Sequence, residues 1–325
     1  MQAVESATVI QAHGRRLSKL IRADGTSEAY DRARLVDLHQ VALASLDALA
    51  DLLRDLAERR DCAVVRGAIL DPDRTRGVRR LLHADTETGD AATLRETPRH
   101  WIALDVDSLP LPPGTDPRDL AGCAGAVLAH LPEAFRQARA LVQATASHAI
   151  KPGARVRLWF WCSRPLSGAE CKRWMAEAQV DRSVFGAAQL IYTARPIFDG
   201  MADPIPCRMV ILPGANAVQA PSPAALAPPL QPALPAPSNA FKGDEVTRFA
   251  ALLRVVQRAP EGERHRHLFW AACRAGELVA RGTLAPDAAA GALVAAAMAG
   301  GGRSLTTAEA TARDGLLRGI RECGR

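Results

Sequence analysis

Two aspartates separated by one residue lie at the end of an apolar stretch, residues 101–109 (WIALDVDSL). In a β-strand alternate side chains point to opposite faces, so Asp105 and Asp107 share a face and lie roughly 6.6–7 Å apart along the strand. Two ionised carboxylates so placed repel each other unless a cation lies between them, and divalent metals prefer such hard oxygen ligands. The pair therefore predicts a metal site, with two acids at a solvated strand end as the alternative.

A second stretch, residues 155–162 (RVRLWFWC), also alternates as a strand does. It places Arg155 and Arg157 on one face, and a guanidinium group is costly to bury without a partner. Arginines that face two metal-binding acids would bind the phosphate oxygens of a metal–triphosphate. The loop before the strand adds two further candidates, His148 and Lys151. An exposed sheet face with ion pairs is the alternative.

Arginines also gather at residues 74–83, which follow a predicted strand at residues 62–70 and the turn Asp71-Pro72-Asp73. A basic loop beside an acidic metal centre would hold a nucleic-acid backbone, although a solvated face is equally consistent with it. The formal net charge of +6 agrees with a polyanion partner without requiring one. The arginines of this loop are Arg74, Arg76, Arg79 and Arg80.

The composition predicts a soluble cytoplasmic protein of about two domains. A length of 325 residues with 48% apolar and 23% charged residues is ordinary for a globular chain. Seven scattered cysteines without a CxxC pair favour reduced thiols and argue against a zinc site. The sequence has neither a secretory signal pattern nor an apolar run of about 18 residues, so we expect no membrane span.

The apolar spacing predicts further elements around the two strands. Leucines recur at three- and four-residue intervals, which favours one long helix over residues 31–60, with a coiled coil as the alternative. A second helix is expected over residues 116–146, kinked or split at Pro132. A third is expected over residues 167–178, where Ser167 and Glu170 match a capping box. Residues 189–198 are candidates for a further strand pair.

A proline-rich, uncharged stretch between residues 213 and 237 predicts an extended linker. The expected organisation is therefore a catalytic domain at residues 1–215, a linker at 216–243 and a helical domain at 244–325.

Three short motifs, in order, resemble those of the archaeo-eukaryotic primase (primase-polymerase) superfamily of plasmids, phages and mobile elements. Motif I there is hydrophobic-D-hydrophobic-D, as in Leu104-Asp105-Val106-Asp107. Motif II, a small and then a basic residue entering a strand, resembles SHAIKPGARVRLWFW, which begins at Ser147. Motif III resembles Val180-Asp181, and YTARPIF from Tyr192 resembles the segment that follows it. The sequence GERHRHLFWAACRAGELVARG, from Gly262, resembles the small domain that follows such primases.

The resemblance covers about residues 60–215 and 244–325. It implies an α+β fold, with a mixed or antiparallel sheet flanked by helices (an RRM-like primase core) and a small all-α C-terminal domain. The implied activity is primer synthesis on single-stranded DNA from nucleoside triphosphates, by nucleotidyl transfer with two Mg²⁺ or Mn²⁺ ions. The chain has no Walker A sequence, so a replicative helicase would be a separate partner.

The resemblance assigns roles to three groups of residues. The metal ligands would be Asp105, Asp107 and Asp181. The nucleotide-binding residues would be Arg157, Arg155, Lys151, His148 and Ser147. The residues that bind nucleic acid would be Arg66, Arg76, Arg79 and Arg80. The chain departs from the family at Arg157, where members usually carry a histidine that contacts the nucleotide phosphates.

Two other classes of protein remain open from the sequence. A DxD glycosyltransferase also holds a metal–nucleotide with paired acids at a strand end, but it needs neither Asp181 nor the helical tail. A non-catalytic origin-binding or single-strand-binding replication protein would keep the basic surface and the tail and would tolerate loss of the acids. Binding of single-stranded template and metal-dependent synthesis distinguish the three.

Overall fold

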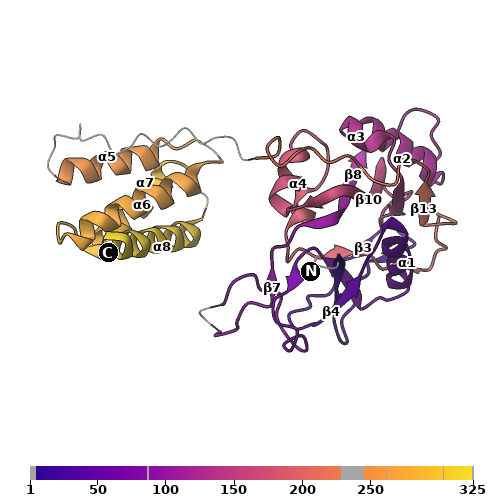
Figure 1. Cartoon of the computed structure of the whole chain (residues 1–325), viewed down its shortest axis with the longest axis horizontal. Coiled ribbons are helices and arrows are strands. Elements are labelled where there is room, and N and C mark those ends of the chain that lie inside the picture. Colours follow the sequence, from indigo (N-terminus) through magenta and orange to yellow (C-terminus); the bar gives the residue numbers. More distant parts are fainter. Residues whose placement is uncertain (1–4, 86–87, 228–244, 261, 303, 324–325) are drawn as a thin grey trace. The chain divides into compact units, whose positions relative to one another are not determined.

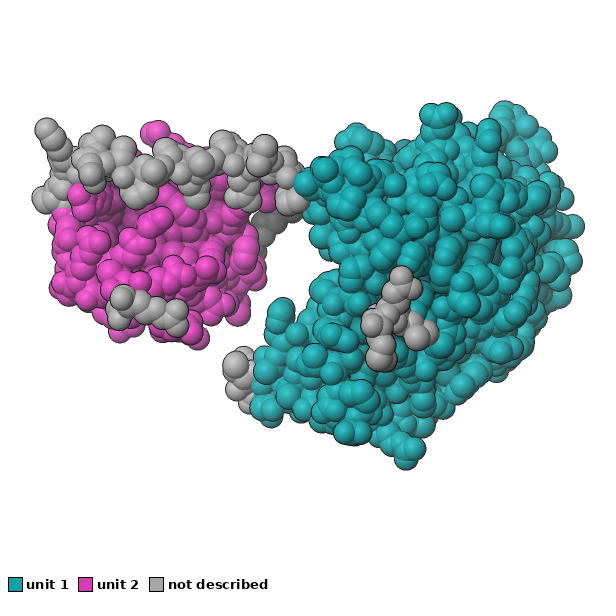
Figure 2. All heavy atoms as spheres, in the orientation of Figure 1, with its two compact units in different colours: residues 1–229 teal, residues 230–325 magenta. Residues whose placement is uncertain are grey.

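The computed structural model describes residues 5–85, 88–227, 245–260, 262–302 and 304–323. It is a mixed α+β structure that divides into two compact units, residues 1–229 and 230–325 (Figure 2). The acids and arginines predicted to do chemistry belong to the first unit, which contains two four-stranded sheets. None of the described helices is long and apolar enough to cross a membrane.

The sheet that carries the acids is antiparallel, with the strand order β13-β9-β10-β8. Its strands are β13 (Met209–Leu212), β9 (Ala140–Ala144), β10 (Ala154–Leu166) and β8 (Arg99–Leu109). The two predicted strands are confirmed as the long neighbours β8 and β10. Both contain aromatic and β-branched residues, which favour strands: Trp101, Ile102 and Val106 in β8, and Val156, Trp159 and Phe160 in β10.

The other four-stranded sheet is also antiparallel, with the order β11-β5-β1-β4. Its strands are β11 (Ile191–Tyr192), β5 (Cys62–Val65), β1 (Ser6–Gln11) and β4 (Asp37–Ala42). Five shorter strands form two small sheets: β2 (Leu20–Arg22), β3 (Ser27–Glu28), β12 (Ile197–Asp199), β6 (Ala68–Ile69) and β7 (Leu94–Arg95). The strand predicted at residues 62–70 is thus divided between β5 and β6. Residues 189–198, the candidates for a strand pair, contain β11 and the start of β12.

Side chains on one face of β8 and β9 hydrogen-bond to backbone carbonyls of the β11-β5-β1-β4 sheet and of the loop that follows β11. The indole Nε1 of Trp101 donates to the carbonyl of Ser6 at 3.1 Å. The Gln143 amide donates to the Thr193 carbonyl at 2.8 Å. Because Gln143 lies directly across from Arg157 in the register, Arg157 is on this same face and lies between the sheets.

The first predicted helix is wrong over its N-terminal half. Helix α1 spans Leu46–Ala57 and begins after Ser45, whose side chain accepts the Ala48 amide, whereas residues 37–42 form β4. The spacing of Leu35, Leu38 and Val41 is helical, but Leu35 is exposed, and pairing with β1 satisfies the β4 backbone instead.

The second predicted helix is wrong over its C-terminal part. Helix α2 (Leu120–Ala129) is followed by α3 (Glu133–Arg136), and Pro132 divides them as predicted. The next residues form β9 rather than helix. All five β9 residues are buried, and periodicity does not distinguish an apolar strand covered on both faces from a helix. Helix α4 (Gly168–Trp174) begins with the predicted Ser167–Glu170 capping box.

The described part of the second unit contains four helices (Figure 1). They are α5 (Glu245–Gln257), α6 (Arg264–Ala280), α7 (Pro286–Ala299) and α8 (Leu305–Cys323). The predicted linker starts too early, because Val218 is fully buried and its amide donates to the Trp161 carbonyl at 2.8 Å. Residues 228–243 of that linker lie outside the described residues.

Candidate functional site

The register of β8 and β10 brings each predicted acid directly across from a predicted arginine. Asp105 pairs with Arg157, and Asp107 pairs with Arg155. The Arg157 Nη2 atom lies 2.6 Å from Asp105 Oδ2, and Arg155 Nη1 forms an ion pair with Asp107 Oδ1. Directly opposite residues in an antiparallel pair share a face, so the four side chains form two adjacent cross-strand ion pairs. The contacts are therefore those of the alternative interpretation, a sheet face with ion pairs. That face is not exposed as expected, because both arginine side chains are largely buried.

Arg157 and Asp105, the inner pair, are more buried than Arg155 and Asp107, the outer pair. The Arg157 side chain is 8% exposed and that of Asp105 20%, whereas Asp107 is 71% exposed. Arg157 Nη1 also donates to the Tyr192 carbonyl at 2.6 Å. Its Nε is buried without a hydrogen-bond partner among the described residues. The guanidinium group therefore retains an unsatisfied donor, in a position where charge-assisted hydrogen bonds are strong.

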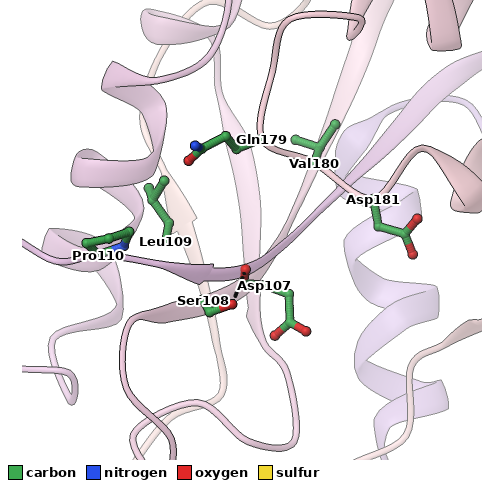
Figure 3. Close-up of a pocket in the computed structure, with 7 residues that line it drawn as sticks. All are labelled: Asp107, Ser108, Leu109, Pro110, Gln179, Val180 and Asp181. Atoms are coloured by element: carbon green, nitrogen blue, oxygen red, sulfur yellow. Dashed lines mark hydrogen bonds between the residues drawn. The ribbon is translucent and has the colours of Figure 1, made fainter.

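The third predicted acid lies close to the first two. The Asp181 amide donates to the Asp105 carbonyl at 2.8 Å, which fixes this loop against β8. Asp181 and Asp107 line one open cavity of about 360 Å³ (Figure 3). The Asp181 carboxylate caps the short 3₁₀ turn Arg182–Phe185 by accepting from the amide and the hydroxyl of Ser183. The structure therefore brings together the motifs that the sequence predicts to meet.

The donor chemistry of these acids suits Mg²⁺ or Mn²⁺, but their arrangement does not yet form a metal site. In the part of the chain that the structure describes, no three His, Cys, Asp or Glu side chains are grouped closely enough to hold an ion. Arginine occupies both strand carboxylates. A cation that binds these carboxylates would compete with the guanidinium groups for them.

The loop before β10 contains the other predicted phosphate ligands, and His148 is not free to bind phosphate there. It is fully buried. The Arg155 amide donates to Nδ1 at 3.1 Å, so Nε2 carries the proton and donates to the Pro117 carbonyl at 2.9 Å. Burial lowers the pKa of this imidazole, which favours the neutral form. Lys151 is exposed, and Ser147 is half-buried, with its carbonyl accepting the Lys151 amide.

A tyrosine pair beside the ion pairs was not predicted. Tyr30 and Tyr192 are the only two tyrosines of the chain, and their rings stack with centroids 3.4 Å apart. Lys19 Nζ lies 5.5 Å from the Tyr30 centroid. Burial raises the pKa of Tyr30 to about 12. Nothing local in the sequence signals this contact, because Tyr30 follows the β2–β3 hairpin, far from every motif.

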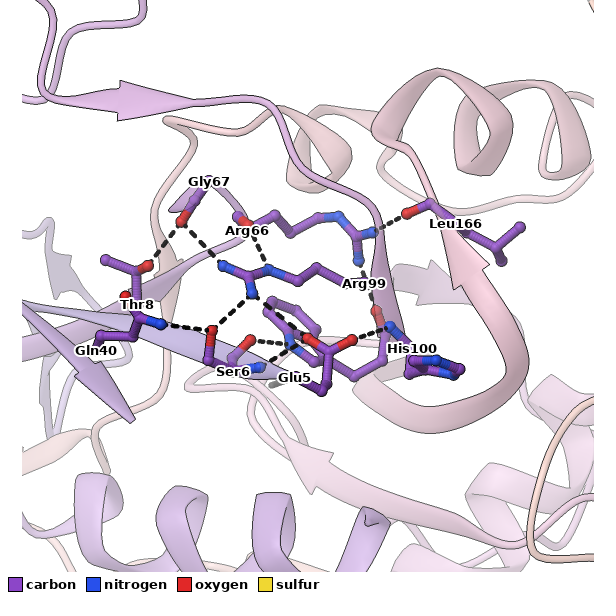
Figure 4. A network of polar contacts seen from close by, with 10 residues as sticks. Glu5, Ser6, Thr8, Gln40, Arg66, Gly67, Arg99, His100 and Leu166 are labelled. Carbon is purple, nitrogen blue, oxygen red and sulfur yellow. Dashed lines mark hydrogen bonds and ion pairs between the residues drawn. The ribbon is translucent and has the colours of Figure 1, made fainter. Parts of the chain in front are cut away.

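Arg66 is not a surface ligand for nucleic acid, which corrects the prediction for this residue. It is 2% exposed, and its two terminal nitrogens donate to the carbonyls of Trp101 at 2.7 Å and Leu166 at 2.9 Å (Figure 4). Arg99 in turn donates to the Arg66 carbonyl at 2.9 Å. The guanidinium of Arg66 therefore joins the ends of β8 and β10 in a buried network.

Of the three loop arginines predicted to bind nucleic acid, two make contacts within the chain. Arg79 forms ion pairs with Asp85 at 2.6 Å and Asp90 at 2.8 Å. Arg80 donates to the Ala188 carbonyl at 2.6 Å, and burial lowers its pKa. Arg76 is exposed, and within the described residues its side chain has no hydrogen bond or ion pair. Of this group, Arg76 best suits a contact with a nucleic-acid backbone.

Comparison of the chain with family models, with curated proteins and with solved structures finds no match in any of the three.

Proposed function

We propose that the chain is a DNA primase-polymerase, a nucleotidyltransferase that makes primers on single-stranded DNA from nucleoside triphosphates. The observation that carries the proposal is the β8–β10 register, which sets Asp105 and Asp107 across from Arg157 and Arg155 with Asp181 bonded to the same strand. A reaction of this class needs acids and phosphate-binding cations within a few ångströms of each other. The likeness of the three motifs to primases supports the same class, with replication of a plasmid, phage or mobile element as the setting.

In this proposal the arginines bind the triphosphate and orient it. Guanidinium groups form bidentate, charge-assisted hydrogen bonds to phosphate, and they act more strongly in a site with little water. Arg157 lies where the primase motif usually has a histidine, and it supplies the same kind of donor from a largely buried position. The three acids are the expected ligands of Mg²⁺ or Mn²⁺, once the cross-strand ion pairs have opened.

The direct test is incubation with single-stranded DNA, labelled nucleotides and Mg²⁺ or Mn²⁺, with products resolved by length. We expect extension products from the wild-type chain and none from a folded Asp105→Asn variant. The matched control is Asp51→Asn, which removes an acid that is 74% exposed and pairs with Arg54 on α1. Equal synthesis by wild type and Asp105→Asn would reject the proposal.

A second candidate is a non-catalytic protein that binds single-stranded DNA, and the ion pairs favour it. Carboxylates already neutralised by arginine can serve as structural links that need no metal. This candidate predicts template binding that falls with salt, no synthesis by any variant, and no change in binding for Asp105→Asn.

A further inference from the structure

We infer that the two cross-strand ion pairs are exchangeable, so that a triphosphate and a divalent cation bind the chain as a coupled pair. In the structure, Arg157 and Arg155 form ion pairs with Asp105 and Asp107. A triphosphate takes the guanidinium groups from the carboxylates, and the freed carboxylates take the cation. This inference rests on the proposed function, because it concerns the same four side chains.

The geometry of the pairs supports exchange rather than a permanent link. Asp107 is 71% exposed, so an approaching ion reaches the outer pair from solvent. The inner guanidinium, by contrast, keeps a buried Nε donor that no described residue satisfies. Phosphate oxygens are acceptors that match the planar fork of a guanidinium. The site thus has a reachable outer pair and an unsatisfied inner donor.

Each ligand alone leaves an uncompensated charge. A cation that binds Asp105 displaces Arg157, whose guanidinium is then largely buried and unpaired. A triphosphate that binds the arginines leaves two neighbouring carboxylates facing each other. When both ligands are present, every one of these charges has a partner. Each ligand therefore raises the affinity for the other, and by linkage the two effects are equal.

The backbone around the acids supports an exchange made by side chains alone. Gly153, in the loop before β10, has a φ of 82°, and a Cβ atom there would lie 2.8 Å from the Leu109 carbonyl oxygen. Ser108, next to Asp107, has a φ of 64°. Such close and conformationally restricted contacts hold the ends of β8 and β10 together. We therefore expect the arginines to rotate while the strands stay in place.

The test measures binding of each probe alone, without catalysis. Free Mn²⁺ is followed by electron paramagnetic resonance, and Arg157→Gln is expected to bind Mn²⁺ about 5- to 150-fold more tightly than wild type because Asp105 is freed. In the reverse arm, inorganic tripolyphosphate is titrated in EDTA, and Asp105→Asn is expected to bind it more tightly by a similar factor. Arg139→Gln is the matched control, since Arg139 pairs with Asp47 on the surface and should change neither affinity.

Unchanged affinities in both arms would overturn the inference. Should Arg157→Gln fail to fold, Arg155→Gln and Asp107→Asn provide the same two arms for the more exposed outer pair. The outcome also separates the inference from the proposed function. Synthesis by wild type with unchanged affinities rejects only the exchange, whereas the two gains in affinity without any synthesis support the exchange and reject the primase.

Discussion

Replacement of Arg66 tests whether a buried arginine of this chain is structural or binds nucleic acid. We consider Arg66→Met, which keeps most of the side-chain length and removes the guanidinium. The two carbonyls that lose a donor, those of Trp101 and Leu166, are in the interior, where an unsatisfied polar group costs about 1–3 kcal/mol. The cation–π contact with Trp101, at 5.0 Å, is also lost.

The two carbonyls account for about 2–6 kcal/mol and the cation–π contact for about 0.5–2 kcal/mol, and removal of a buried charge offsets part of this loss. We therefore expect the free energy of unfolding of the first unit to fall by about 2–4 kcal/mol. At about 2–4 °C per kcal/mol for a unit of this size, Tm should fall by about 4–16 °C. Tryptophan fluorescence suits the measurement, since Trp101, Trp159, Trp161 and Trp174 are four of the five tryptophans and all belong to the first unit.

The control is Arg76→Met, which changes an exposed arginine and should shift the free energy of unfolding by less than about 0.5 kcal/mol. If Arg66 instead bound nucleic acid, Arg66→Met would leave Tm unchanged and weaken binding to single-stranded DNA. That result would refute the structural assignment of Arg66.

Two further predictions concern a buried histidine and a close helix contact. Because burial lowers the pKa of His148, the unfolded chain binds the additional proton first, so the free energy of unfolding should fall as pH drops below the ordinary histidine pKa of about 6.5. Denaturant titrations at pH 7.5 and 5.5 measure this fall in the free energy of unfolding. It should be smaller for His148→Asn than for wild type, whereas the surface change His130→Asn should leave it unchanged. Gly319→Ala should separate α6 from α8, since its Cβ would lie 1.9 Å from the Cys273 carbonyl oxygen, and it should speed amide hydrogen exchange in both helices. Gly291→Ala in α7 is the control, since a Cβ there meets nothing within 4 Å, and it should instead stabilise the chain by about 0.5–1 kcal/mol. Equal amide exchange rates in the two variants would contradict the packing argument.

The local pattern was enough to predict the two strands at the centre of the site. Once residues 101–109 and 155–162 are taken as strands, the period of two fixes which of their side chains share a face. The same reasoning predicted that Asp105 and Asp107 share a face, and that Arg155 and Arg157 do. The capping box at Ser167 and the break at Pro132 likewise depend on neighbours within a few residues.

The pattern was insufficient where long-range pairing outweighs local preference. Leu35, Leu38 and Val41 have helical spacing, yet residues 37–42 form β4 because β1 supplies their hydrogen bonds. Residues 140–144 are covered on both faces, so their apolar run carries no period from which to distinguish a strand from a helix. Val218 is joined to β10 although its surroundings have the composition of a linker.

For this protein, the sequence by itself determined which acids and which arginines share a strand face, because that depends only on alternation along one strand. The tertiary structure decided the partners: the antiparallel register sets Arg157 across from Asp105, and the approach of the two sheets buries that pair. It also turned Arg66 inward and stacked Tyr30 on Tyr192. Such contacts join residues far apart in the chain, and their energies depend on burial and pairing that exist only once the sheets have assembled.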